Sequence, residues 1–178
     1  MSLQSTREFI LQEKIGSFKD KVWVLNTEKE KLGYFKGKLI KIGNTFRLYD
    51  MSDNALYTVD EKLISMRSTY TFYKGGEKED DMMLGKLKRK LVSIKPKYYF
   101  EDLEEETIYE MKGNIFKLKY EIKKKGNTIA EISRKFFKSL VRDSYGVKID
   151  EDATDEDAMI VLCTVIMLHH EKEEEDNR

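Results

Sequence analysis

One pattern returns along most of this chain, and it limits the fold more than any other feature. Each copy begins with a charged residue or glycine, followed by a short apolar stretch. A second stretch follows, in which apolar and other residues alternate. The clearest copies are residues 37–42 with 46–50, 61–66 with 70–73, and 89–94 with 98–100. Weaker copies begin at Glu13, Gly113 and Arg134. The second residues of the six copies lie at positions 14, 38, 62, 90, 114 and 135. A repeat of this length indicates one supersecondary unit used many times.

Each copy predicts a strand, a turn and a second strand, because the apolar residues of its second part alternate with a period of two. We expect the following side chains to point inward: Val22, Val24, Phe46, Leu48, Tyr70, Phe72, Tyr98, Phe100, Tyr120, Ile122, Val147 and Ile149. Their neighbours Arg47, Thr71, Glu121 and Lys148 are expected to face water, whereas Trp23 and Tyr99 break the pattern. Turn residues separate the units at 52–54, 75–76 and 126–127.

The last part of the chain differs from the repeats. Residues 158–168 are apolar except for Thr164, and they follow the acidic residues 150–157. Thr154 is suited to cap a helix whose first turn carries carboxylates, so we predict an acidic linker at 150–154, a helix at about 155–172 and a charged tail at 173–178. The predicted core residues of this helix are Ala158, Val161, Leu162, Val165, Ile166 and Leu168.

A helix that is apolar on every side must be enclosed by protein or by lipid. The eleven residues of the apolar run rise only about 16 Å, against a hydrocarbon core of about 30 Å, which favours a buried core helix over a membrane anchor. Closure of twelve strands into a barrel would remove the exposed sheet edges and would leave room for a helix inside. The prediction is therefore a mainly β, single domain over residues 1–178: a closed antiparallel 12-stranded β-barrel of six hairpins, with strands at about 8–149, around a central hydrophobic C-terminal α-helix.

Charge and cysteine content limit the setting and the partners. The chain has 33 basic and 33 acidic residues, but residues 1–100 carry 20 basic and 13 acidic groups, and the remainder carries the opposite excess. This balanced total makes nucleic acid an unlikely partner. A single cysteine and the lack of a signal-peptide pattern predict a reducing, cytoplasmic location.

Signals for catalysis or cofactors are weak. Cys163 and His170 share a helix face but lie about 10 Å apart along the axis, too far for a thiolate–imidazole pair, and His169 and His170 are interpreted as a polar helix end. Asp150, Asp152 and Thr154 have calcium-loop spacing, but Asp155 and Val161 occupy the positions where an EF-hand needs glycine and glutamate. We expect no enzyme activity, no cofactor and no metal.

Two basic clusters are the strongest candidates for a binding surface. The first consists of Lys86, Lys88, Arg89, Lys90, Lys95 and Lys97, and the second of Lys123, Lys124, Lys125, Arg134, Lys135 and Lys138. Several of these side chains would share an outer face and attract the phosphates of an anionic lipid surface. The alternative is that they only solvate the outside of the barrel and discourage strand pairing.

The repeated hairpins, residues 132–137 leading to 143–147, the acidic linker and the apolar helix at 157–170 together resemble the LURP-one-related family. The resemblance covers about residues 8–172. It implies the fold of the tubby C-terminal domain and a relationship to the phospholipid scramblases, and it brings no catalytic residues. Tubby domains bind phosphoinositide head groups through basic residues. Two functions are therefore expected: peripheral binding of anionic phospholipid or phosphoinositide-like head groups at the membrane through the first cluster, or, alternatively, a protein-interaction scaffold without lipid affinity.

Overall fold

The computed structural model describes residues 2–13, 21–37, 43–64, 67–90, 97–114, 119–137 and 144–176. These ranges form twelve strands, one short 3-10 helix and one α-helix. Their bounds are β1 (Glu8–Glu13), β2 (Lys21–Leu25), β3 (Lys31–Lys36), β4 (Thr45–Asp50), β5 (Ala55–Ile64), β6 (Arg67–Lys74), η1 (Asp80–Met82), β7 (Met83–Arg89), β8 (Lys97–Glu101), β9 (Thr107–Asn114), β10 (Lys119–Lys124), β11 (Asn127–Ser133), β12 (Ser144–Ile149) and α1 (Asp155–Asp176).

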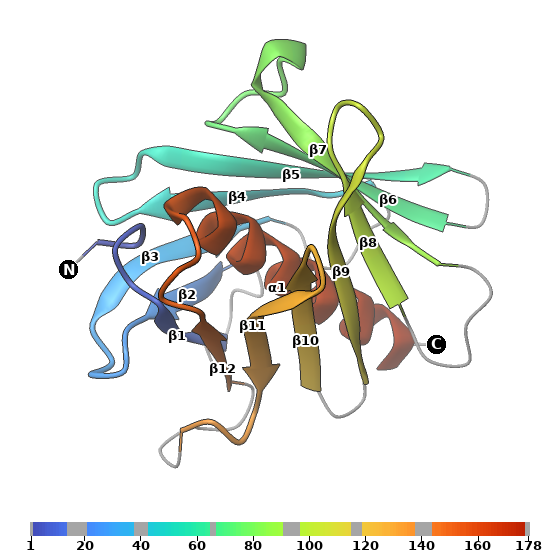
Figure 1. The fold of residues 1–178 in the computed structure, drawn as a ribbon. Coiled ribbons are helices and arrows are strands. Elements are labelled where there is room, and N and C mark those ends of the chain that lie inside the picture. Colours follow the sequence, from blue (N-terminus) through green and yellow to red (C-terminus); the bar gives the residue numbers. More distant parts are fainter. Residues whose placement is uncertain are drawn as a thin grey trace.

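The strands form a closed antiparallel barrel around α1 (Figure 1). Every strand pairs with its neighbours in the chain, and β1 pairs with β12 to close the barrel, with Phe9 opposite Val147 and Leu11 opposite Tyr145. Closure leaves every strand with a partner on both sides, so no edge is left to pair with another chain. The predicted 12-stranded barrel is confirmed.

The alternation of apolar residues sets the two faces of the sheet. All twelve side chains expected to point inward are buried. Of the four expected to face water, Thr71 is an exception at 4 % exposed, because it lies between Asp60 and Lys86 on the neighbouring strands and its short side chain is covered by longer ones. The leading stretches of the repeat at 38–42, 91–94 and 115–118 lie outside the described residues.

Helix α1 occupies the interior of the barrel, as Figure 1 shows. Its residues are buried on every side from Asp157 to Glu171, and each of the six predicted core residues is at most 1 % exposed. No helix among the described residues is both long and apolar enough to cross a membrane. The helix runs to Asp176, four residues beyond the predicted end, because the Glu and Lys residues that follow His170 are good helix formers.

The start of α1 is held by a reciprocal cap. The backbone N–H of Asp157 donates to Thr154 Oγ1 at 3.1 Å, and the Thr154 N–H donates to Asp157 Oδ2 at 3.0 Å. Arg7, just before β1, donates to the carbonyl of Ala153 and to Asp155, each at 2.9 Å. The predicted N-cap is confirmed, and these contacts hold the start of α1 against the start of β1.

Candidate functional site

The candidate binding residues of the first basic cluster do not all share a face. Lys86 and Lys88 lie on the outer face of β7, since they alternate with the fully buried Leu87. Lys90 and Lys97 are exposed at the ends of β7 and β8. Lys95 lies outside the described residues.

Arg89 faces the inner side of the sheet, although 42 % of its side chain is exposed. It lies two residues after the buried Leu87, so its side chain points to the same face of the strand. Its guanidinium lies 3.9 Å from the carboxylate of Glu171 on α1, and the Glu171 side chain is 8 % exposed. Alternation along β7 therefore separates Arg89 from its two lysine neighbours. It contacts the helix and is not part of the outer basic surface.

Three lysines stand side by side on the outer face. The backbone N–H of Lys90 donates to the carbonyl of Lys97 at 2.8 Å, and Lys97 is directly opposite Lys112 of β9. Neighbouring strands lie about 4.8 Å apart, and like charges placed directly opposite each other are unfavourable. The row Lys90–Lys97–Lys112 is thus a place where an anion would relieve repulsion.

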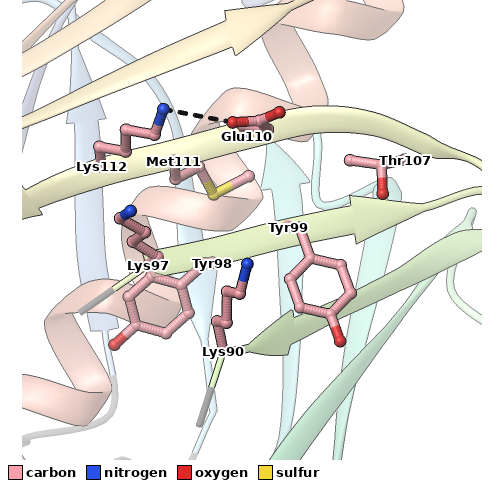
Figure 2. Close-up of a pocket in the computed structure, with 8 residues that line it drawn as sticks. All are labelled: Lys90, Lys97, Tyr98, Tyr99, Thr107, Glu110, Met111 and Lys112. Atoms are coloured by element: carbon pink, nitrogen blue, oxygen red, sulfur yellow. Dashed lines mark ion pairs between the residues drawn. The ribbon is translucent and has the colours of Figure 1, made fainter. Parts of the chain in front are cut away.

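A hollow of about 360 Å³ lies at this row (Figure 2). Its lining residues are Lys90, Lys97, Tyr98, Tyr99, Thr107, Glu110, Met111 and Lys112. Lys90 directly follows β7, Lys97 begins β8 and Lys112 lies in β9, and Tyr99 and Thr107 bring hydroxyl groups. Sequence reasoning missed Lys112, Tyr99, Thr107 and Glu110, because only the pairing of β8 with β9 brings them together.

Two lysines of this outer face are paired with carboxylates, and only one of them, Lys112, belongs to the row. Lys88 donates to Glu101, and this hydrogen bond raises the pKa of Lys88 against the opposing effect of burial. Lys112 lies 3.4 Å from Glu110, but both side chains are at least half exposed, so water screens the pair. Among the described residues, Lys90 and Lys97 have no carboxylate within ion-pair distance.

The second basic cluster is divided in a similar way. Lys124 forms an ion pair with Asp157 at 2.8 Å, and Lys123 lies 3.6 Å from Glu121. Lys125, Arg134 and Lys135 are exposed, and Lys138 lies outside the described residues. Near this cluster is a second hollow of about 500 Å³ that shares Lys112 with the first and is bordered by Phe136.

A polar cluster inside the barrel surrounds the last turns of α1. His170 Nε2 lies 3.3 Å from Glu61 Oε2, and both side chains are completely buried. Glu171 accepts from the hydroxyls of Tyr70 and Tyr98, and burial is the largest cause that raises the pKa of Tyr98. The expected polar helix end is therefore an enclosed one, with His169 and His170 at 4 % and 0 % exposed, because the barrel extends past them.

The residues that the sequence singled out for catalytic or metal chemistry lie as follows. Cys163 is buried, and burial raises the pKa of its thiol, so it is a poor nucleophile. Asp150, the first residue of the segment with calcium-loop spacing, accepts a hydrogen bond from the backbone N–H of Asp152 at 2.9 Å. No group of three or more His, Cys, Asp or Glu side chains is placed to hold a metal within the described part of the chain.

Three kinds of comparison with known proteins each give a match over nearly the whole chain. The sequence model of the family described as LURP-one-related matches residues 7–168. The uncharacterized protein YxjI of Bacillus subtilis (strain 168) is 24 % identical over 161 residues, which cover 90 % of each chain. An X-ray structure of a protein from Arabidopsis thaliana aligns with a TM-score of 0.65 and 15 % identity, covering 97 % of this chain and 91 % of that one. This last match supports the fold alone.

Proposed function

The chain belongs to the LURP-one-related family, and from that premise we propose that it is a non-enzymatic domain that binds anionic phospholipid head groups at the cytoplasmic surface of a membrane. The head group would enter the hollow lined by Lys90, Lys97 and Lys112. Lys86, farther along the same outer face, would contribute to the attractive field, whereas Glu101 compensates the charge of Lys88.

The observation that carries the proposal is the row of three lysines. Three cations side by side at the wall of a hollow of about 360 Å³ suit the phosphates of one head group. Tyr99 and Thr107 supply hydroxyl groups for its remaining polar atoms. Each lysine near an anionic surface contributes about 1 kcal/mol to membrane binding, so the row accounts for an affinity difference of about a hundredfold.

Vesicle flotation tests this function directly. The wild-type chain should float with vesicles that contain phosphatidylserine or a phosphoinositide, and should stay behind with pure phosphatidylcholine. Lys90→Ala/Lys97→Ala/Lys112→Ala should weaken binding to acidic vesicles by about a hundredfold. Binding should also weaken as salt rises, because exposed charges are screened.

The matched control is Lys29→Ala/Lys62→Ala/Lys74→Ala, which removes the same charge from three exposed positions outside the hollow. It should bind as the wild type does. Arg89 is kept in all variants, since its interior contact with Glu171 would confuse a surface effect with a folding effect. Equal binding of wild type to acidic and neutral vesicles would refute the function, and would leave the protein-interaction scaffold as the alternative.

A further inference from the structure

A second row of cations lies on a different part of the barrel. Lys21 of β2 is directly opposite Lys36 of β3, and Lys36 is directly opposite Arg47 of β4. Arg47 donates to the carbonyl of Gly76 at 2.9 Å, but none of the three has a carboxylate within ion-pair distance among the described residues. This row has the same unfavourable like-charge pairing as the row in the hollow.

A row of aromatic side chains runs beside these cations on the same outer face. Trp23 is opposite Tyr34, with ring centroids 5.5 Å apart, and Tyr34 stacks on Tyr49 at 5.1 Å. The ammonium of Lys21 lies 3.5 Å from the Tyr34 ring centroid and 4.7 Å from that of Trp23. Trp23 and Tyr49 stay partly exposed, so this outer face of β2–β4 joins cations to accessible aromatic rings. Trp, Tyr and Arg are the residue types enriched at protein interfaces.

A partner for this face must bring carboxylates and an apolar side chain on a narrow, projecting element, since closure of the barrel rules out addition of a strand at an edge. The turn between β8 and β9 has these features. Leu103 at its tip is 59 % exposed, and the exposed Glu104, Glu105 and Glu106 follow it with no cation within ion-pair distance in the described structure. The turn is shaped by Asp102, whose Oδ1 accepts from the backbone N–H of Glu104 at 2.9 Å and of Glu106 at 3.0 Å.

We propose that the outer face of β2–β4 binds the β8–β9 turn of a second copy of this chain, with the three glutamates on the cation row and Leu103 on the aromatic row. In the order of strands around the barrel, β3 and β9 are six strands apart, so the face and the turn lie on opposite sides. When two copies bind in this way, one copy keeps its β8–β9 turn free and the other keeps its β2–β4 face free. Such a head-to-tail contact extends into a chain of molecules unless a ring closes.

Sedimentation velocity of the full chain over a range of concentrations tests the proposal. At low salt the mean sedimentation coefficient should rise with concentration, and at high salt it should not, since the screening length falls from about 10 Å at 0.1 M to about 3 Å at 1 M ionic strength. The emission of Trp23, the single tryptophan, should change over the same concentration range. A wild type that stays monomeric at low salt at its highest concentration would refute the proposal.

Charge reversal then tests the two surfaces. Lys21→Glu/Lys36→Glu and Glu104→Lys/Glu105→Lys should each weaken self-association at least tenfold, and the chain that carries all four changes should regain it. If Lys21→Glu/Lys36→Glu does not fold, Lys36→Glu alone replaces it, because Lys36 is exposed. This single variant should also weaken self-association. Lys62→Glu/Lys74→Glu controls for net charge and should associate as the wild type does. Association that none of the face variants weakens would refute the proposed contact.

Discussion

Asp157 is a carboxylate kept charged within the apolar interior of the barrel. Burial is the largest single influence and raises its pKa, but the hydrogen bonds from Lys124, Tyr109 and Thr154 together outweigh it and bring the pKa below the ordinary 3.8. Because the folded pKa lies below the unfolded one, the charged form stabilises the fold above pH 3.8, and this contribution is lost as the pH falls towards the folded pKa.

Asp157→Asn should therefore destabilise the domain at pH 7 by about 3 kcal/mol, the scale for a broken buried ion pair. The difference from wild type should shrink in acid, as the wild-type carboxylate itself becomes protonated. Urea unfolding at pH 7 and at acidic pH measures both effects. Asp155→Asn, at a position 63 % exposed, is the control and should cost at most about 1 kcal/mol. A difference that does not change with pH would contradict the assignment.

Single residues also show where sequence reasoning succeeds and fails. Alternation correctly placed the inward aromatic and aliphatic side chains, but the count of lysines and arginines in one stretch grouped Arg89 with Lys90, although their side chains lie on opposite faces of the sheet. Lys112 was missed because it is distant in sequence, and only the hairpin register puts it opposite Lys97. The site thus depends on strand pairing, which a local pattern does not contain.

Helix α1 illustrates the dependence of one element on all the others. Its apolar residues point in every direction, so the isolated helix has no face for water, and the twelve strands supply the enclosure. The cap at Thr154 and the apolar run were readable from sequence. The burial of His169 and His170 was not, because a polar helix end is compatible with either water or an enclosed polar cluster.

Val161→Asp or Ile166→Asp should unfold the domain, because each would place a charge without a partner at a position that is at most 1 % exposed. Val161→Ala is the matched control: it removes methyl groups only and should lower the free energy of unfolding by about 2 kcal/mol while the domain stays folded. Far-UV circular dichroism and thermal melting distinguish the two results. A well-folded Val161→Asp chain would mean that the helix is not enclosed.

Strand β3 shows why the elements were harder to delimit than to detect. Its residues Leu32 to Phe35 are all buried, because Tyr34 on the outer face is covered by Tyr49 and Lys21. The period of two is then lost, and a register shift between Val24 and Leu25 of β2 also leaves Leu32 of β3 without a directly opposite residue. The partner strand β4 keeps its alternation, with Phe46 and Leu48 inside and Arg47 outside, and was correctly predicted.

At the scale of the whole molecule, closure and filling make the barrel one unit. Every strand is hydrogen-bonded on both sides, and the apolar side chains of the strands and of α1 form a single core. The repeat and the apolar helix were enough to predict this architecture. The two cation rows on which the proposals rest were less accessible, because they come from strands that are brought together by the barrel.

Such a molecule should unfold in one step. Trp23 reports on the outer face of β2, whereas the circular dichroism of α1 reports on the interior, and the two signals should give the same thermal midpoint. Dynamic light scattering at the same concentration, in high salt, checks that association does not contribute to either signal. Two separate midpoints would show that the helix leaves the barrel, or that a group of strands melts, independently.

The order of the elements along the chain has a consequence for biosynthesis. A ribosome makes all twelve strands before α1, and β12, which closes the barrel against β1, only just before it. Until then the inner face of the sheet has nothing to enclose, and its apolar side chains stay open to other proteins. Folding of this domain is therefore expected to finish only after α1 has been made, and the nascent strands are exposed to chaperones during that interval.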